Sequence, residues 1–120
     1  EAIAMWQDDL LFSRWIDGAH EQLSCLYAGD LSREEKVRAR EKTFRSLKGD
    51  FRTIRGHFQT GCYPDMEKVD LNNASLMAYW QYFHGLERFE ALYQDCGGDL
   101  RKVVDYFKEI RRSGQEPADL

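Results

Sequence analysis

The chain has 120 residues, of which 42% are hydrophobic and 32% are charged; this balance excludes a disordered segment and supports a packed core. The formal net charge of -4 at pH 7 excludes a general attraction to nucleic acid or to an anionic membrane, so either partner would need a local basic patch. No apolar run reaches about 18 residues, so the sequence predicts no transmembrane segment.

The two ends of the chain carry little structural signal. It starts at Glu1 rather than at a methionine, and its first residues are acidic, so no signal peptide is visible. We therefore expect a piece of a longer protein, with a single helical domain over residues 1–112 and a flexible polar tail over 113–120.

The three cysteines are widely spaced and suit neither a disulfide framework nor a zinc finger. We expect Cys25 and Cys96 to be small core residues.

A long first helix is predicted over residues 2–28, where apolar residues recur at steps of three and four and would share one face. Gly29 stops this helix, and Ser32 with Glu35 forms the S-x-x-E capping box that begins the next one. The apolar face consists of Phe12, Trp15, Ile16, Ala19, Leu23, Leu26 and Tyr27.

A long amphipathic helix is predicted over about residues 33–58 by a narrow apolar seam between charged residues. From Arg33 to Arg55, nine basic residues stand against four acidic ones, a local net charge of +5. The basic residues are distributed on both sides of the seam, which favours a solvated helix face. Nucleic-acid binding would require a continuous stripe of the arginines, and we expect no nucleic-acid partner. The seam consists of Val37, Phe44, Leu47, Phe51, Ile54 and Phe58.

Three shorter helices are expected after a loop that ends near Leu71. The first runs over about residues 73–83, the second stops at Gly97-Gly98, and the third is capped by Asp99. No alternation of period two is long enough for a strand. The sequence therefore predicts an all-α bundle of four to five helices.

One segment of the first helix begins like the HExxH motif of zinc metalloproteases. That motif needs two histidines four residues apart on one helical face to hold the metal. In His20-Glu21-Gln22-Leu23-Ser24 the second histidine is replaced by Ser24. We therefore expect His20 and Glu21 to be a solvated pair, and no metal ligand in this helix.

Two adjacent amides, Asn72 and Asn73, stand directly before the third helix. Asparagine is a favoured N-cap, but one cap needs only one amide. The second could satisfy buried backbone groups or bind a peptide ligand, and spacing does not choose between these roles. The aromatic residues that follow, Tyr79 to Phe83, are more typical of a core than of a binding site.

Five blocks of the chain form a pattern: Leu26-Tyr27, Leu31-Ser32-Arg33-Glu34-Glu35-Lys36, Leu71-Asn72-Asn73-Ala74 with Tyr82, Phe89-Glu90-Ala91-Leu92, and Cys96-Gly97-Gly98-Asp99-Leu100. In this order and spacing they resemble the C-terminal part of a bacterial family of zinc-dependent aminopeptidases. The resemblance extends from about Phe12 to Ile110 and is more specific than any single motif. Asp70 and Glu87 stand where the family usually has proline, which affects the loops rather than the helices.

The resemblance implies a parent enzyme that removes N-terminal residues from peptides with a zinc-activated water. The family's HExxH helix and third zinc ligand lie upstream, so zinc is implied for the parent, none is expected in this chain, and the isolated chain is expected to be inactive. An alternative register would make Glu1 the third ligand, but it needs a deletion before Leu23. The expected partners are a peptide substrate and the N-terminal catalytic half. The resemblance makes Asn72, Asn73 and Tyr82 the best candidates to reach that half, either to orient the substrate or to support the zinc ligands. The phenol of Tyr82 could also stabilise a developing oxyanion.

A second hypothesis is a helical protein-interaction module without catalytic activity. A large exposed apolar patch around Trp6, Trp15 or Trp80 would favour it. The sequence leaves open the substrate preference, the oligomeric state, and whether the parent is in the bacterial cytoplasm or periplasm or is lipid-anchored.

Overall fold

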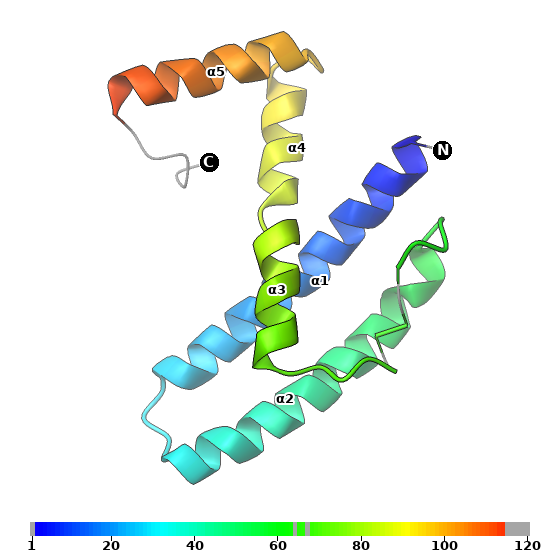
Figure 1. Ribbon diagram of the computed structural model, residues 1–120, viewed down its shortest axis with the longest axis vertical. Helices are drawn as coiled ribbons and strands as arrows, with labels where there is room; N and C mark the ends of the chain where they lie inside the picture. The colour runs from blue at the N-terminus through cyan, green and yellow to red at the C-terminus, as the bar shows by residue number, and fades with distance from the viewer. Residues whose placement is uncertain (1, 64, 67, 115–120) are drawn as a thin grey trace. The chain divides into compact units, whose positions relative to one another are not determined.

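The computed structural model describes residues 2–63, 65–66 and 68–114 (Figure 1). Within these residues the only regular secondary structure is helical, which confirms the all-α prediction. None of the described helices is long and apolar enough to span a membrane. The elements are α1 (Ala2–Ala28), α2 (Arg33–Ile54), the short 3-10 helix η1 (Arg55–His57), α3 (Asn73–Phe83), α4 (Leu86–Asp95) and α5 (Leu100–Ser113).

Contacts divide the chain into two compact units, Glu1–His84 and Gly85–Leu120. The first contains α1, α2, η1 and α3, and the second contains α4 and α5. The single domain over residues 1–112 stays a prediction. Of the predicted tail, Ser113 still belongs to α5, and residues 115–120 lie outside the described residues.

The first two helices form a hairpin in which α1 packs against α2 (Figure 1). The predicted capping box begins α2: Ser32 Oγ accepts from the Glu35 N–H at 3.2 Å, and Glu35 Oε2 accepts from the Ser32 N–H at 3.0 Å. Lys36 Nζ adds a 3.0 Å hydrogen bond to the carbonyl of Tyr27. The Lys36 hydrogen bond connects the last turn of α1 to the first turn of α2.

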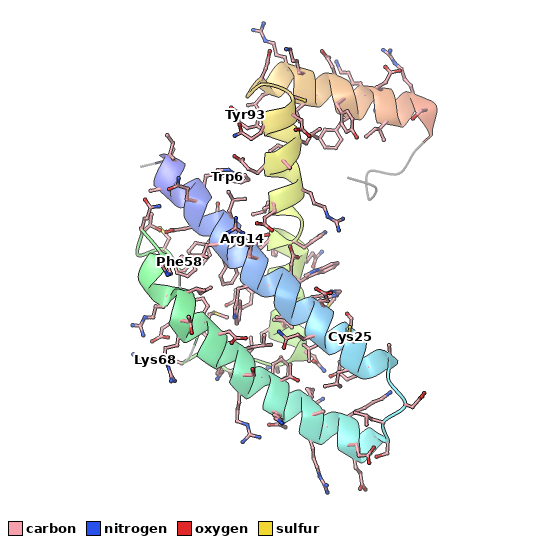
Figure 2. The ribbon with its side chains drawn as sticks, turned by 180° about the vertical axis from the view of Figure 1, so that it is seen from behind. Trp6, Arg14, Cys25, Phe58, Lys68 and Tyr93 are labelled. Carbon is pink, nitrogen blue, oxygen red and sulfur yellow. The ribbon has the colours of Figure 1, made fainter. Side chains whose placement is uncertain are left out.

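Two of the three cysteines, Cys25 and Cys62, are exposed, and Figure 2 labels Cys25 on α1. Cys25 is exposed and Cys96 is half-buried, so the prediction that both are core residues is wrong for Cys25. The reason is the helical period: Cys25 follows the buried Leu23 by two residues, about 200° around the helix. That rotation places it on the side of α1 away from the packed face.

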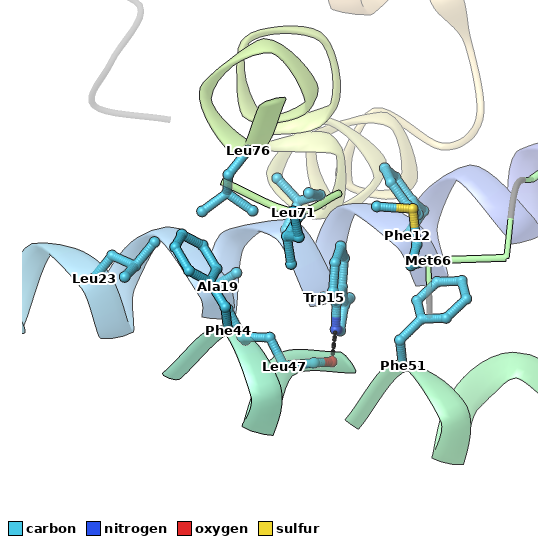
Figure 3. Close-up of a cluster of buried hydrophobic side chains, with 11 residues drawn as sticks. Phe12, Trp15, Ala19, Leu23, Phe44, Leu47, Phe51, Met66, Leu71 and Leu76 are labelled. Atoms are coloured by element: carbon cyan, nitrogen blue, oxygen red, sulfur yellow. Dashed lines mark hydrogen bonds between the residues drawn. The ribbon is translucent and has the colours of Figure 1, made fainter. Parts of the chain in front are cut away.

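The core of the first unit lies where α1 meets α2, α3 and the loop that connects α2 to α3 (Figure 3). The predicted faces of α1 and α2 provide most of it, and Trp15 Nε1 donates to the Leu47 carbonyl at 3.0 Å. Each large apolar side chain buried here contributes roughly 1.5–3 kcal/mol. The buried cluster consists of Phe12, Trp15, Ile16, Ala19, Leu23, Phe44, Leu47, Phe51, Met66, Leu71 and Leu76.

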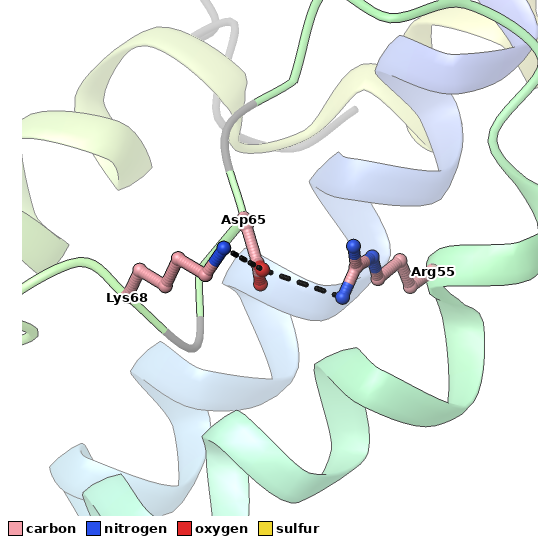
Figure 4. Close-up of polar contacts among 3 residues, drawn as sticks. All are labelled: Arg55, Asp65 and Lys68. Atoms are coloured by element: carbon pink, nitrogen blue, oxygen red, sulfur yellow. Dashed lines mark ion pairs between the residues drawn. The ribbon is translucent and has the colours of Figure 1, made fainter.

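The long second helix is confirmed, with a tighter last turn. The α-helix ends at Ile54 and η1 follows, after which Phe58 is extended (φ -69°, ψ 133°) and packs against the core. In the following loop, the carboxylate of Asp65 forms ion pairs with Arg55 at 3.3 Å and with Lys68 at 3.8 Å (Figure 4). Both cations are largely exposed, so these pairs contribute little to stability.

The second unit is built from α4 and α5. The end of α4 and the start of α5 follow the sequence signals. Gly97 and Gly98 end α4 with left-handed backbone (φ 71° and 73°), and Asp99 caps α5 by accepting from the Arg101 N–H at 2.9 Å. On the predicted apolar face of α5, Val103 and Ile110 are buried. Two other members of that face, Leu100 and Val104, are 60% and 51% exposed.

Candidate functional site

The first of the two predicted amides caps α3. Asn72 has extended backbone, and its Oδ1 accepts from the Ser75 N–H at 3.0 Å while Ser75 Oγ accepts from the Asn72 N–H at 3.0 Å. This reciprocal pair satisfies two N–H groups that the first turn of a helix leaves without partners. Because only Oδ1 is used in the cap, the Nδ2 group of Asn72 is still able to donate.

The second amide has a different partner, on the last turn of α1. Asn73 Nδ2 donates to the Tyr27 hydroxyl at 2.8 Å, and the hydroxyl lies 3.2 Å from Asn73 Oδ1. Asn73 therefore connects α3 to α1. The pair that spacing left unassigned divides into one cap and one interhelical contact.

Tyr82 lies at the other end of α3 from the two asparagines. Ten residues of helix separate it from Asn72, a rise of about 15 Å, and its side chain is 80% exposed. Tyr79, Trp80 and Phe83 of the same aromatic run pack against the core, as expected. The structure thus brings Asn72 and Asn73 together and leaves Tyr82 apart from them.

Both asparagines line a basic groove along α2. It consists of two neighbouring cavities of about 450 and 480 Å³, which share Arg40 and Asn73 as lining residues. We call it the basic groove and define it by its cations and amides: Arg33, Lys36, Arg40, Arg45, Lys48, Asn72 and Asn73. Five of the nine basic residues counted between positions 33 and 55 therefore collect on one side of α2.

The charge in the basic groove is only partly compensated. Glu41 and Asp70 are the acidic residues among its lining. Among the described residues, the guanidinium groups of Arg33, Arg40 and Arg45 have no carboxylate at ion-pair distance. The groove is therefore suited to an anionic ligand.

Sequence reasoning missed a buried carboxylate near the start of α1. Asp8 is 1% exposed, and its two oxygens accept from the Gln59 N–H (2.8 Å), the Thr60 N–H (2.8 Å) and Thr60 Oγ1 (2.6 Å). Burial by itself raises the pKa of Asp8, but these three hydrogen bonds outweigh it and hold the pKa below its ordinary value. A signal existed: Asp8 lies four residues before Phe12, on the predicted apolar face.

A second contact attaches the loop after η1 to α1. The Tyr63 hydroxyl donates to the carboxylate of Asp9, and burial together with this bond and the nearby negative charges raises the pKa of Tyr63. Asp8 and Asp9 thus fix residues 59–63 to the first helix. Because Asp8 is inaccessible and fully engaged by donors, its role is structural.

His20 is not the solvated residue that the sequence predicted. It is half-buried and stacks on Trp80 with ring centroids 4.2 Å apart, while His84 stacks with Trp80 at 4.1 Å. His84 is also the exposed C-cap of α3, with Nδ1 2.7 Å from the Trp80 carbonyl. The neighbour of His20 is therefore the indole ring of Trp80 rather than Glu21, and sequence spacing could not identify it.

The described residues do not form a complete zinc site by themselves. No group of three or more His, Cys, Asp or Glu side chains among them is arranged to hold a metal. Glu1, the ligand of the alternative register, lies outside the described residues.

Replacing Asn72 by alanine is expected to lower the free energy of unfolding by about 1 kcal/mol, because the cap of α3 is lost. Asn72→Ser keeps a capping oxygen and is the matched control, with a change of a few tenths of a kcal/mol. Urea unfolding followed by circular dichroism measures both. Equal stability of Asn72→Ala and the unchanged chain would contradict a capping role.

Comparison with known proteins identifies one family. The family model described as "Putative aminopeptidase" matches residues 1–119. The searches of curated proteins and of solved structures find no match.

Proposed function

Because the chain belongs to the putative aminopeptidase family, we propose that it is the C-terminal helical domain of an enzyme that hydrolyses N-terminal peptide bonds with a zinc-activated water. The observation that carries this proposal is the family match over nearly the whole chain. The five sequence blocks support the assignment to the C-terminal part.

The proposed role of this chain is binding and support rather than metal chemistry. Its sequence contains no HExxH motif. In the proposal the zinc is held by the N-terminal catalytic half of the parent. The groove amides Asn72 and Asn73 are then placed to contact a peptide, and the exposed phenol of Tyr82 is free to contact the catalytic half.

The test compares the full-length parent with the 120-residue chain. We expect the parent to release p-nitroaniline from aminoacyl p-nitroanilides but not from their N-acetylated forms, and to lose this activity with a chelator. The chain alone is expected to show no activity and no stoichiometric zinc binding by isothermal titration calorimetry. A parent that cleaves neither substrate, or a tight zinc site on the chain, would contradict the proposal.

Replacing Tyr82 by phenylalanine in the parent tests whether the phenol acts in the reaction. Loss of one hydrogen-bond donor to a developing oxyanion lowers kcat by about 100-fold or more. The fold is expected to remain unchanged, because the side chain is 80% exposed. Steady-state kinetics separate the roles: an unchanged kcat and KM would show that Tyr82 does not contact the substrate or its transition state.

An interaction module without catalysis is the second candidate function. The tryptophans do not form the exposed patch that would favour it, because Trp15 is buried and Trp6 and Trp80 are half-buried. One observation does support it: on α5, Leu100 and Val104 are more than half exposed. An inactive full-length parent in the assay above would favour this second function.

A further inference from the structure

We propose that the basic groove binds a carboxylate group of a peptide. The inference rests on the proposed function, because it names a class of substrate: peptides that carry a carboxylate at the C-terminus or on an acidic side chain. The family assignment does not identify this site, and neither asparagine alone would indicate it.

The basic groove carries a net positive charge. Five basic side chains and two acidic ones line the groove, a local net charge of +3 in a chain whose net charge is -4. In the half of the groove that contains Arg33, Lys36 and Arg40, the lining has no acidic residue at all. A positive site on an acidic chain attracts a small anionic group while the rest of the surface repels polyanions.

The basic groove also contains hydrogen-bond donors for a carboxylate. Lys36 already donates to the Tyr27 carbonyl and Asn73 is engaged with the Tyr27 hydroxyl. Arg40 has no such partner among the described residues, and it lines both cavities. A guanidinium binds a carboxylate through two parallel hydrogen bonds, and the Nδ2 group of Asn72 provides a further donor in the same groove.

The apolar lining of the basic groove favours a peptide over a nucleic acid. Tyr27, Leu31 and Val37 line the half of the groove without acidic residues, and they are 40%, 44% and 41% exposed. Each cavity lies in the size range of small-ligand sites, about 300–1,000 Å³. Such a site accommodates an amino-acid side chain beside its carboxylate, whereas a nucleic acid needs a longer basic track with bases stacked on aromatic rings.

Fluorescence anisotropy of labelled hexapeptides, titrated with the 120-residue chain, tests the inference. One pair of peptides differs only in a free or amidated C-terminus, and a second pair, both amidated, differs in Glu or Gln at one position. We expect the carboxylate form of at least one pair to bind about tenfold tighter than its neutral form. The pair that shows the difference identifies the source of the carboxylate.

Variants locate the site. Arg40→Gln is expected to remove the preference for the carboxylate form, and Arg40→Lys to restore only part of it, because lysine cannot form the bidentate pair. Asn72→Ser keeps the cap and is expected to weaken binding by a few-fold. Lys42→Gln is the matched control: Lys42 is exposed on the same helix but lines neither cavity, and we expect less than a twofold change.

Three results would overturn the inference. The first is equal binding of carboxylate and neutral peptides, and the second is a preference for the carboxylate form that survives Arg40→Gln. The third is tighter binding of a single-stranded oligonucleotide than of either peptide, with a steep dependence on salt. Because the assay measures binding without turnover, its failure is distinct from a failure of the parent enzyme to cleave peptides.

Discussion

Replacing Phe12 by alanine is expected to lower the free energy of unfolding of the first unit by about 3–5 kcal/mol. The Phe12 side chain is fully buried, and it lies at the centre of an aromatic cluster. Its ring contacts Trp15, Phe51, Tyr63, Tyr79 and Phe83, with centroid separations from 4.8 to 6.5 Å. These partners come from α1, α2, the loop and α3, so one cavity would weaken every interface of the unit.

Urea unfolding followed by tryptophan fluorescence measures this loss, because Trp15 reports on the same core. Phe12→Leu is the matched control: it keeps most of the volume, and we expect it to cost less than about 1.5 kcal/mol. Since small domains are stable by only about 5–15 kcal/mol, Phe12→Ala is expected to remove a large part of the stability of the first unit. A loss below about 1 kcal/mol would show that the cluster does not support the fold.

The helices could be predicted because their signals are local. The Ser32–Glu35 capping box and the stop at Gly97-Gly98 each involve residues within one turn of the boundary that they form. The apolar faces of α1 and α2 likewise follow from spacing alone. Local spacing likewise predicted that one of the two asparagines caps α3, and the structure identifies it as Asn72, whose partner Ser75 is three residues away.

Contacts between distant segments could not be predicted in this way. Asp8 and its partner Thr60 are 52 residues apart, and Asn73 and Tyr27 are 46 residues apart. Without a pairing between the helices, the sequence shows an acidic residue on an apolar face and a surplus amide, but not what either one binds. The aspartate was the more informative of the two, because a buried carboxylate requires donors.

The basic groove of the candidate site could not be predicted from the sequence for the same reason. Spacing showed that the cations of α2 flank the apolar seam, but which of them share a cavity depends on where α3 begins. The structure places Asn72 and Asn73 beside Arg40, and this turns one side of an apparently solvated helix into a lined groove. Its proposed ligand is therefore an inference from tertiary structure.

Replacing Asp8 by asparagine is expected to lower the free energy of unfolding by about 2–4 kcal/mol. Asparagine keeps one acceptor oxygen, but its NH2 group replaces the other and faces either the Gln59 N–H or the Thr60 N–H, which then has no acceptor. The remaining hydrogen bond loses its charged partner. Thr60→Val removes only the hydroxyl donor and is expected to cost about half as much. Asp50→Asn, at an exposed position of α2, is the matched control and is expected to change stability by less than about 0.5 kcal/mol.

The pH dependence separates loss of the charge from loss of packing. Because the hydrogen bonds hold the pKa of Asp8 below its ordinary value in the folded chain, the unfolded chain binds more protons in acid. The stabilisation is therefore complete above the unfolded pKa, near pH 4, and is lost as the pH falls through the folded pKa. Urea midpoints measured from pH 6 to pH 2 should fall less steeply for Asp8→Asn than for Asp50→Asn. Parallel curves would show that the Asp8 carboxylate does not hold residues 59 and 60 through its charge.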